Sequence, residues 1–253
     1  MGIPNQFNDI IQKHLDVFAA WVPIVNKYAL GDYGIFADGV FDRLGNITDD
    51  FGITFKTGSG SDASIDFTSA NTKVVKFNAG AEVSVIPEGA VDAKIELEFQ
   101  SEKSFLVKSP TITVVTIDNV NMVGNQLKEL KNWDGKWKIV HKVYNAVDAV
   151  IVSTISAGTK LTFTGDVNAL QQLKLGNAGV NINTNRELGL KINGKNGVIG
   201  LGLFMVKSGL FGGKKVKILG EALGESDAFI KVMPGDENDD LVRETEDMLV
   251  AEP

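Results

Sequence analysis

Two neighbouring segments of the chain alternate apolar and polar side chains with a period of two. In residues 75–85 the odd positions are apolar, and Lys76, Asn78 and Glu82 stand between them. The same alternation resumes over 93–99, after a turn-like segment at 86–90. A period of two is typical of a β-strand that has one face in an apolar environment and the other in water. The sequence therefore predicts an antiparallel hairpin with two different faces.

The alternation leaves two environments open for the apolar face. The core of a globular protein is the commoner one. A lipid bilayer is the other, because a tilted membrane-spanning strand needs about 9–11 residues and each segment is close to that length. A second hairpin is predicted over 147–163, with a turn at 156–158. The residues expected to face lipid are Val75, Phe77, Val83, Val85, Ile95, Leu97, Phe99, Ile151, Ile155, Leu161 and Phe163.

The composition excludes several classes of protein. The chain has 253 residues, 43% of them hydrophobic, which is enough for a substantial core. It has no cysteine, which excludes disulfides, thiolate metal sites and a cysteine nucleophile. The first residues show no secretory signal, and no apolar run is long enough for a transmembrane helix. A cytoplasmic location is expected for the soluble form.

Charge is unevenly distributed along the chain. Residues 221–253 carry eleven acidic and two basic side chains, a net charge of -9, whereas the whole chain has -7 and the first 220 residues therefore +2. Such an end is usually a solvated tail. Alternatively, it covers a basic surface until that surface is used. We expect a body at 1–220 and an acidic C-terminal tail at 221–253, either inhibitory or disordered.

The remaining patterns indicate an α+β fold. Apolar residues at helical spacing predict an N-terminal helix over 7–22, bracketed by Pro4 and Pro23. Short strands are expected over 28–47, and a second helix over 118–131 is expected to be capped by Asp118. Further strands follow at 139–144 and over 180–206, where Asn193-Gly194 signals a hairpin turn. The predicted fold is a twisted, mostly antiparallel sheet with an N-terminal and a mid-chain helix.

The usual catalytic constellations are missing. His14 and His141 are far apart in the sequence and show no metal-ligand spacing, so we expect each to be structural or exposed. The loop 58–61 lacks the frame of a nucleophile elbow, and 212–215 lacks the pattern of a phosphate-binding loop. The carboxylates among 92–98 alternate with Lys94, as on a solvated strand face. We expect no enzymatic activity, no metal and no cofactor.

A cluster of basic and aromatic residues lies in the middle of the chain. This composition suits the headgroup level of an anionic bilayer. It also suits single-stranded nucleic acid, or an ordinary turn followed by a strand with a core tryptophan. We expect lipid headgroups rather than nucleic acid. The expected headgroup-binding residues are Lys128, Lys131, Trp133, Lys136, Trp137, Lys138, Lys214, Lys215 and Lys217.

In this order the segments resemble the gasdermin family, particularly its compact bacterial and fungal members. The resemblance covers about residues 25–207: a meander ending in Gly39-Val40-Phe41-Asp42-Arg43-Leu44-Gly45-Asn46, two alternating hairpins, a helix between them and a closing set of strands. It implies a protein that oligomerises on membranes and converts two hairpin regions, here about 62–101 and 149–192, into four strands of a large barrel. A closed barrel satisfies every backbone hydrogen bond in hydrocarbon, so hairpins must assemble before they insert.

The resemblance also implies partners and a role in cell death or defence. The expected partners are anionic membrane lipids, further copies of the chain, and an activating protease or partner protein. The chain departs from the family in two respects: it lacks the N-terminal cysteine of bacterial members and the large inhibitory domain of animal members. If inhibition exists, we expect residues 221–253 to mask either Lys207 and the lysines at 214–217, or the 128–142 cluster. The alternative function is a non-enzymatic interaction module with an acidic docking tail.

Overall fold

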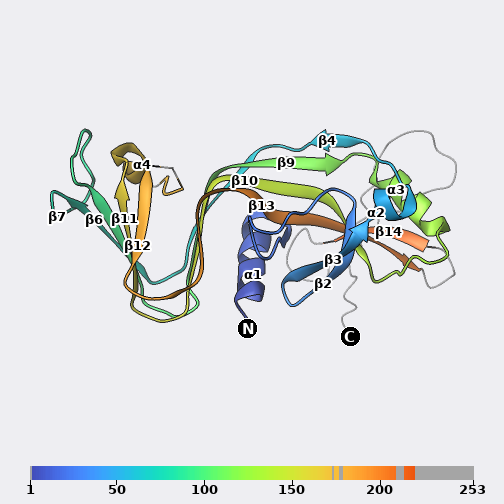
Figure 1. The fold of residues 1–253 in the computed structure, drawn as a ribbon, viewed down its shortest axis with the longest axis horizontal. Helices are drawn as coiled ribbons and strands as arrows, with labels where there is room; N and C mark the ends of the chain where they lie inside the picture. Colours follow the sequence, from blue (N-terminus) through green and yellow to red (C-terminus); the bar gives the residue numbers. More distant parts are fainter. Residues whose placement is uncertain (1, 173, 177–178, 209–213, 220–253) are drawn as a thin grey trace, which may run out of the picture.

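The chain forms an elongated α+β molecule in which two antiparallel sheets lie side by side along the long axis (Figure 1). The computed structural model describes residues 2–172, 174–176, 179–208 and 214–219. Its helices are α1 (Ile3–Leu15), α2 (Ile47–Phe51), α3 (Val120–Glu129) and α4 (Val167–Gln171). The predicted fold class, with an N-terminal and a mid-chain helix on a mostly antiparallel sheet, is confirmed. None of the helices in the described ranges is long and apolar enough to cross a bilayer.

The large sheet is built around three long strands. β10 is 17 residues long and pairs with β9 on one side and with β13, of 21 residues, on the other. β9 and β10 are rich in valine and isoleucine, whose branched side chains pack well on a pleated surface. The strands of this sheet are β1 (Phe18–Ala19), β2 (Asp32–Ala37), β3 (Val40–Asn46), β4 (Thr57–Ser59), β5 (Ala63–Thr68), β9 (Phe105–Ile117), β10 (Lys138–Thr154), β13 (Leu188–Ser208) and β14 (Lys214–Leu219).

The small sheet contains the predicted 75–99 hairpin and the second arm of the predicted 147–163 hairpin. Its strand order is β12-β11-β8-β6-β7, so the two hairpins meet where β8 pairs with β11. The strands are β6 (Thr72–Asn78), β7 (Ala81–Val83), β8 (Lys94–Phe99), β11 (Thr159–Gly165) and β12 (Val180–Thr184).

Four strands of the small sheet continue four strands of the large sheet in the same order. The large sheet has the order β5-β9-β10-β13 and the small sheet β6-β8-β11-β12. The connections are short: residues 69–71, 100–104, 155–158 and 185–187. Figure 1 shows the four connections bending together, so that the small sheet folds back beside the end of the large one. The two sheets are thus one four-stranded ribbon with a common bend.

Both faces of this ribbon are covered by protein next to the bend. On one side, Phe7 and Ile11 of α1 are fully buried against a cluster that includes Phe105, Val107 and Ile151 of the large sheet. On the other side, Leu106 and Val152 share a core with the apolar residues of the small sheet. Alternate residues of β9 and β10 therefore face α1 and the small sheet in turn.

The predicted strand over 75–85 is interrupted. Ala79 and Gly80 have φ of 49° and 84°, which makes a tight turn between β6 and β7. Two adjacent left-handed residues are typical of the two-residue hairpin turn. The alternation continues across the turn because both arms have a period of two, so it gave no sign of the break.

Three other boundaries differ from the expectation. α1 ends at Leu15 rather than near Pro23, because Asp16 is left-handed and Phe18 and Ala19 pair with β13. α3 begins after Asn119 and its start is not capped by Asp118, which accepts a hydrogen bond of 2.7 Å from Thr116 instead. The strand at 139–144 and the first arm of the second hairpin form one strand, β10.

Candidate functional site

The small sheet has one apolar and one charged face at its centre. Leu97 lies opposite Leu161, and Ile95 lies opposite Phe163. These side chains and Phe99 are at most 3% exposed. They pack against Leu106, Val150 and Val152 of the large sheet and against Ala169 and Leu170 of α4. The alternation in β8 and β11 thus places five of the predicted lipid-facing residues together on one buried face.

The opposite face carries a charge network. The Lys160 ammonium donates a hydrogen bond of 3.0 Å to Glu96 and lies 3.7 Å from a carboxylate oxygen of Glu98. The hydrogen bond to Glu96 raises the pKa of Lys160. These side chains are partly exposed, so the pairs add little to stability. Their role is to keep this face in water.

The other predicted lipid-facing residues do not join the apolar face. Val75 lies opposite Glu96 and Phe77 opposite Lys94, so both stand on the charged face. The Lys94 ammonium lies 4.2 Å from the centre of the Phe77 ring. Val83 is in β7, Val85 is 63% exposed, Ile155 is 44% exposed in a connection, and Ile151 faces α1 in the large sheet. Contact of these residues with lipid remains a prediction.

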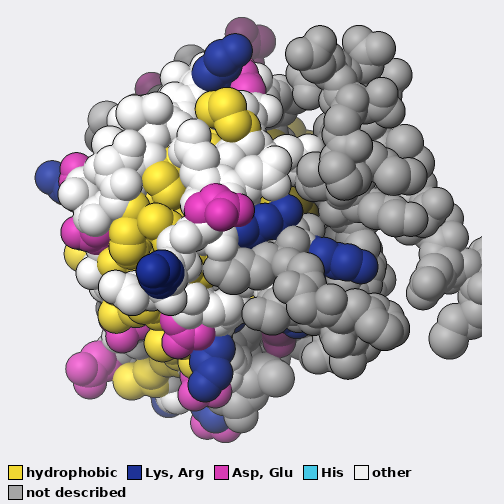
Figure 2. All heavy atoms as spheres, turned by 90° about the vertical axis from the view of Figure 1, so that its right-hand side faces the viewer, with side chains coloured by type: hydrophobic (Ala, Val, Ile, Leu, Met, Phe, Trp, Pro, Cys, Tyr) yellow, Lys and Arg dark blue, Asp and Glu magenta, His cyan; other side chains and the backbone are white. Residues whose placement is uncertain are grey.

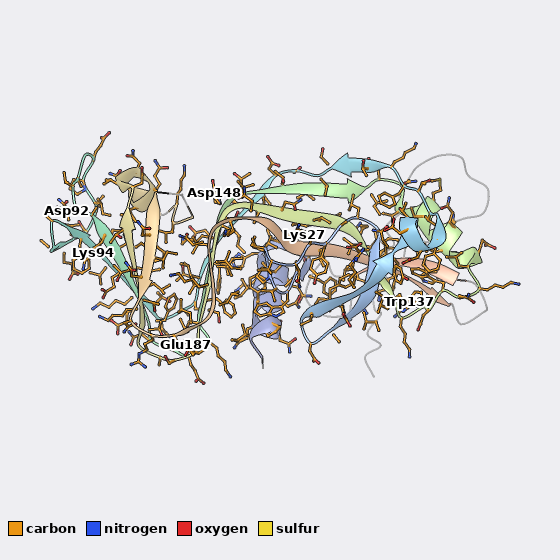
Figure 3. All side chains as sticks on the ribbon, viewed as in Figure 1. Lys27, Asp92, Lys94, Trp137, Asp148 and Glu187 are labelled. Carbon is orange, nitrogen blue, oxygen red and sulfur yellow. The ribbon has the colours of Figure 1, made fainter. Side chains whose placement is uncertain are left out.

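The predicted headgroup residues lie at the opposite end of the molecule. Lys94 in the small sheet and Trp137 mark the two ends in Figure 3. Trp133 is only 8% exposed and packs against Tyr33, Phe51 and Trp137, at ring distances of 5.1 to 5.6 Å. It therefore lies in the core and is not exposed as a headgroup contact requires. The reading of this segment as a turn with a core tryptophan describes Trp133 better.

Several lysines gather where β10, β13 and β14 end. Lys207 of β13 lies directly opposite Lys215 of β14. Met205 of β13 lies between two lysines, with Lys217 of β14 opposite it on one side and Lys138 of β10 on the other. Burial, and then the charge of Lys207, lower the pKa of Lys138. A like charge beside a partly buried ammonium favours binding of an anion. Figure 2 shows, however, that basic, acidic and hydrophobic side chains are mixed over this end.

Lys128 is on α3 and its pKa is lowered by burial. Lys131 and Lys136 follow α3 as exposed side chains. The side chain of Lys214 and the expected acidic tail lie outside the described residues, so headgroup binding and masking by residues 221–253 remain predictions.

The histidines do not form a site. His141 is 3% exposed and packs edge-on against Phe204, whereas His14 is exposed and contacts Phe67. A shallow hollow of about 420 Å³ lies between the end of α1 and the large sheet, lined by His14, Ser61 and Lys142 among others. No pattern in the sequence indicated it. Within the described ranges, no group of three or more His, Asp or Glu side chains could hold a metal ion.

The strongest feature that sequence reasoning missed is the set of residues in the bend. Lys103 and Arg186 stand in connections between the sheets, and Lys73 is the second residue of β6, just after another connection. Figure 3 marks Glu187, the neighbour of Arg186, at the bend. The periodicity of the sequence could not predict that these residues lie at the bend, because the bend depends on the common order of the strands in the two sheets.

Comparison with known proteins gives one similarity. No protein-family model matches the sequence, and no curated protein matches it. Among solved structures, the chain is similar to a bacterial gasdermin from Bradyrhizobium tropiciagri, with 13% identity and a TM-score of 0.40. The similarity covers 86% of this chain and 91% of that chain. The matched structure is a member of the family that the sequence resembles.

Proposed function

We propose that the protein is a gasdermin-like pore-forming protein that oligomerises on membranes and permeabilises them, in cell death or defence. One observation carries the proposal: the strands of the small sheet continue those of the large sheet in the same order. Straightening the four short connections turns two packed sheets into one long four-stranded sheet without breaking the order of strands.

The physical reason lies in the faces of the small sheet. Ile95, Leu97 and Phe99 are buried against other parts of the same protein, while Lys94, Glu96 and Glu98 face outward. After straightening, the first set loses its protein cover and needs another apolar phase. Lipid supplies that phase, because β8 joined to β9 in the straight sheet exceeds the about 9–11 residues that a tilted membrane-spanning strand needs. Several copies must join, because an open sheet edge leaves backbone groups unpaired in hydrocarbon.

Leakage of dye from vesicles tests this function. We expect the full chain to release dye from vesicles that contain anionic lipid, either directly or after cleavage at a protease site introduced after Gly220 in the folded protein. Absence of release from both forms, with vesicles to which they bind, would leave the interaction module as the better function.

A pair of substitutions in β8 tests the role of its two faces. Leu97→Asp should abolish leakage, because a charge on the lipid face of a membrane strand costs up to about 2–4 kcal/mol, somewhat less for acids. Glu96→Gln, one residue away on the charged face, should leave leakage intact. Leu97 is 3% exposed, so circular dichroism and a thermal melt must show that the variant is folded. Equal leakage by the two folded variants would contradict the assignment of faces.

A further inference from the structure

The pairing of β8 with β11 already has the register of a straight sheet. In an antiparallel ladder, a step forward on one strand is a step back on its partner. In the large sheet Phe105 lies opposite Ser153. Eight further steps along this ladder place Leu97 opposite Leu161, which is the pairing seen in the small sheet. The central strands therefore keep one register through the bend.

The outer strands do not keep it. In the large sheet Phe67 lies opposite Val107, and ten further steps would place Phe77 opposite Leu97. The small sheet instead has Val74 opposite Leu97, an offset of three residues. On the other side, Ile151 lies opposite Ile192, and ten steps would place Leu161 opposite Ile182, whereas the structure has Phe163 there, an offset of two.

The two offsets have different effects on the faces. An odd offset moves every side chain of β6 to the other face, whereas an even offset leaves those of β12 where they are. In the bent fold Val75 and Phe77 therefore stand beside Glu96 and Lys94. In the straight register they would stand beside Phe99 and Leu97, and Lys76 and Asn78 would join the charged face.

The straight register makes a band of membrane-spanning length. Over 75–83, 91–99 and 159–167, every second residue is apolar except Thr159 and Gly165, and the residues between are polar except Gly80; Val74 stands just outside this band. Val180 and Ile182 continue the apolar face on the fourth strand. Nine residues at a tilt of 45° span about 21 Å, close to the apolar band of an outer-membrane-type barrel. The next row on the same side holds Lys73, Ser101, Ala157 and Arg186, which places cations at the edge of the band.

The bend reverses the faces at four places. Asn71, Lys103 and Gly158 have φ of 61°, 56° and 71°, and each lies in one connection. In the fourth strand a bulge at Gly189 sets Leu190 opposite Ser153 but Leu188 opposite Thr154. A left-handed residue or a bulge interrupts the alternation of faces. As a result, Phe99 packs with Leu106 rather than with Phe105. Extended backbone at these residues would join the two apolar faces into one.

We infer that the small sheet has a second register, in which β6 slides three residues along β8 and β12 slides two along β11 as the connections straighten on a membrane. This inference rests on the proposed function and names the conformational change that it needs. The lipid-facing surface of β6 is then created by the slide and does not exist in the bent fold.

Cysteine pairs distinguish the two registers, and the chain has no other cysteine. Lys73 lies opposite Glu98 in the bent fold, so Lys73→Cys with Glu98→Cys should form a disulfide in solution. The oxidised protein should not leak dye, and reduction should restore leakage. In the bent fold, position 76 lies three residues along β6 from the position opposite Glu98. This separation of about 10 Å is too large for a disulfide between Lys76→Cys and Glu98→Cys. This pair should form a disulfide within one chain only on vesicles.

A second measurement needs no disulfide. Val75→Lys places a lysine opposite Glu96 in the bent fold, so it should fold normally, yet it should lower leakage at least about tenfold because Val75 reaches the lipid face after the slide. Val74→Lys, at a side chain that is 50% exposed, should leave leakage unchanged.

The outcomes separate the inference from the function. The second register is wrong if the oxidised Lys73/Glu98 cysteine pair releases as much dye as the reduced variant and the parent chain. It is also wrong if Val74→Lys, rather than Val75→Lys, lowers dye release. In both cases the pore-forming function stands. If no form leaks, the proposed function fails, and the second register fails with it.

Discussion

His141 is a buried titratable residue at the centre of the large sheet. Its ring lies in β10, 5.9 Å from the ring of Phe204 and almost without exposure. Burial, and then the charge of Lys142, lower its pKa to about 3, from 6.5 in an unfolded chain. The folded protein therefore holds this imidazole neutral, and protonation favours the unfolded state.

This shift predicts a loss of stability in mild acid. The contribution of a neutral His141 is fully present above pH 6.5 and is lost as the pH falls toward 3, by about 1.4 kcal/mol per pH unit at most. Urea denaturation at pH 7.5, 6 and 5 should show this slope before most carboxylates titrate. His141→Gln removes the titrating group, so the slope should flatten. An unchanged slope in that variant would assign the pH dependence to other groups.

Among the elements, the connections between the sheets influence the balance between the bent and the straight sheet. Lys103 is left-handed, a conformation that costs a residue with a β-carbon about 1–2 kcal/mol. The packing of Phe99 against Leu106 and Val152 offsets this cost in the bent state. A substitution that raises the cost should therefore move the protein toward the straight sheet.

Lys103→Val raises the cost, because a β-branched side chain tolerates the left-handed region poorly. We expect a lower free energy of unfolding and faster leakage. Asp38→Val is the matched control, since Asp38 has φ of 51° in the turn between β2 and β3, away from the bend. It should lose similar stability without faster leakage, measured by denaturation and dye release at equal folded concentration. Equal acceleration in both variants would mean that general destabilisation causes the change.

At the scale of the whole molecule, charge is divided between the first 220 residues, with a net charge of +2, and the last 33, with -9. A surface with a net negative charge is repelled by an anionic bilayer, and salt screens this repulsion over about 10 Å at 0.1 M. The acidic end therefore opposes the binding that the proposed function needs, whatever its conformation.

Cleavage after Gly220 in the folded protein should strengthen binding to anionic vesicles. The gain in a sedimentation assay should be largest at low salt and shrink as salt increases, because it is electrostatic. Neutral vesicles serve as the control and should show no gain. A gain of equal size on neutral vesicles would indicate that residues 221–253 block an apolar surface instead.

Local sequence patterns were enough to establish the α+β class and the two-faced character of β8 and β11. Ile95, Leu97 and Phe99 alternate with charged residues over a single unbroken strand, so local periodicity was sufficient to assign their faces. It also excluded cysteine chemistry and located the acidic end. These properties depend only on which residues are neighbours along the chain.

Strand register and burial depend on contacts between distant segments, so periodicity could not predict them. Val75 and Phe77 show the same alternation as Leu97, yet they lie on the other face, because a strand's face depends on its register with a partner. The residues beside Trp133 in the sequence fit both a headgroup contact and a core tryptophan. Its packing against the rings of Tyr33 and Phe51 shows that it is a core residue. The bend and the common strand order likewise arise from contacts between segments far apart in the sequence. Pairing and burial are properties of such contacts, so they were fixed only when the chain folded.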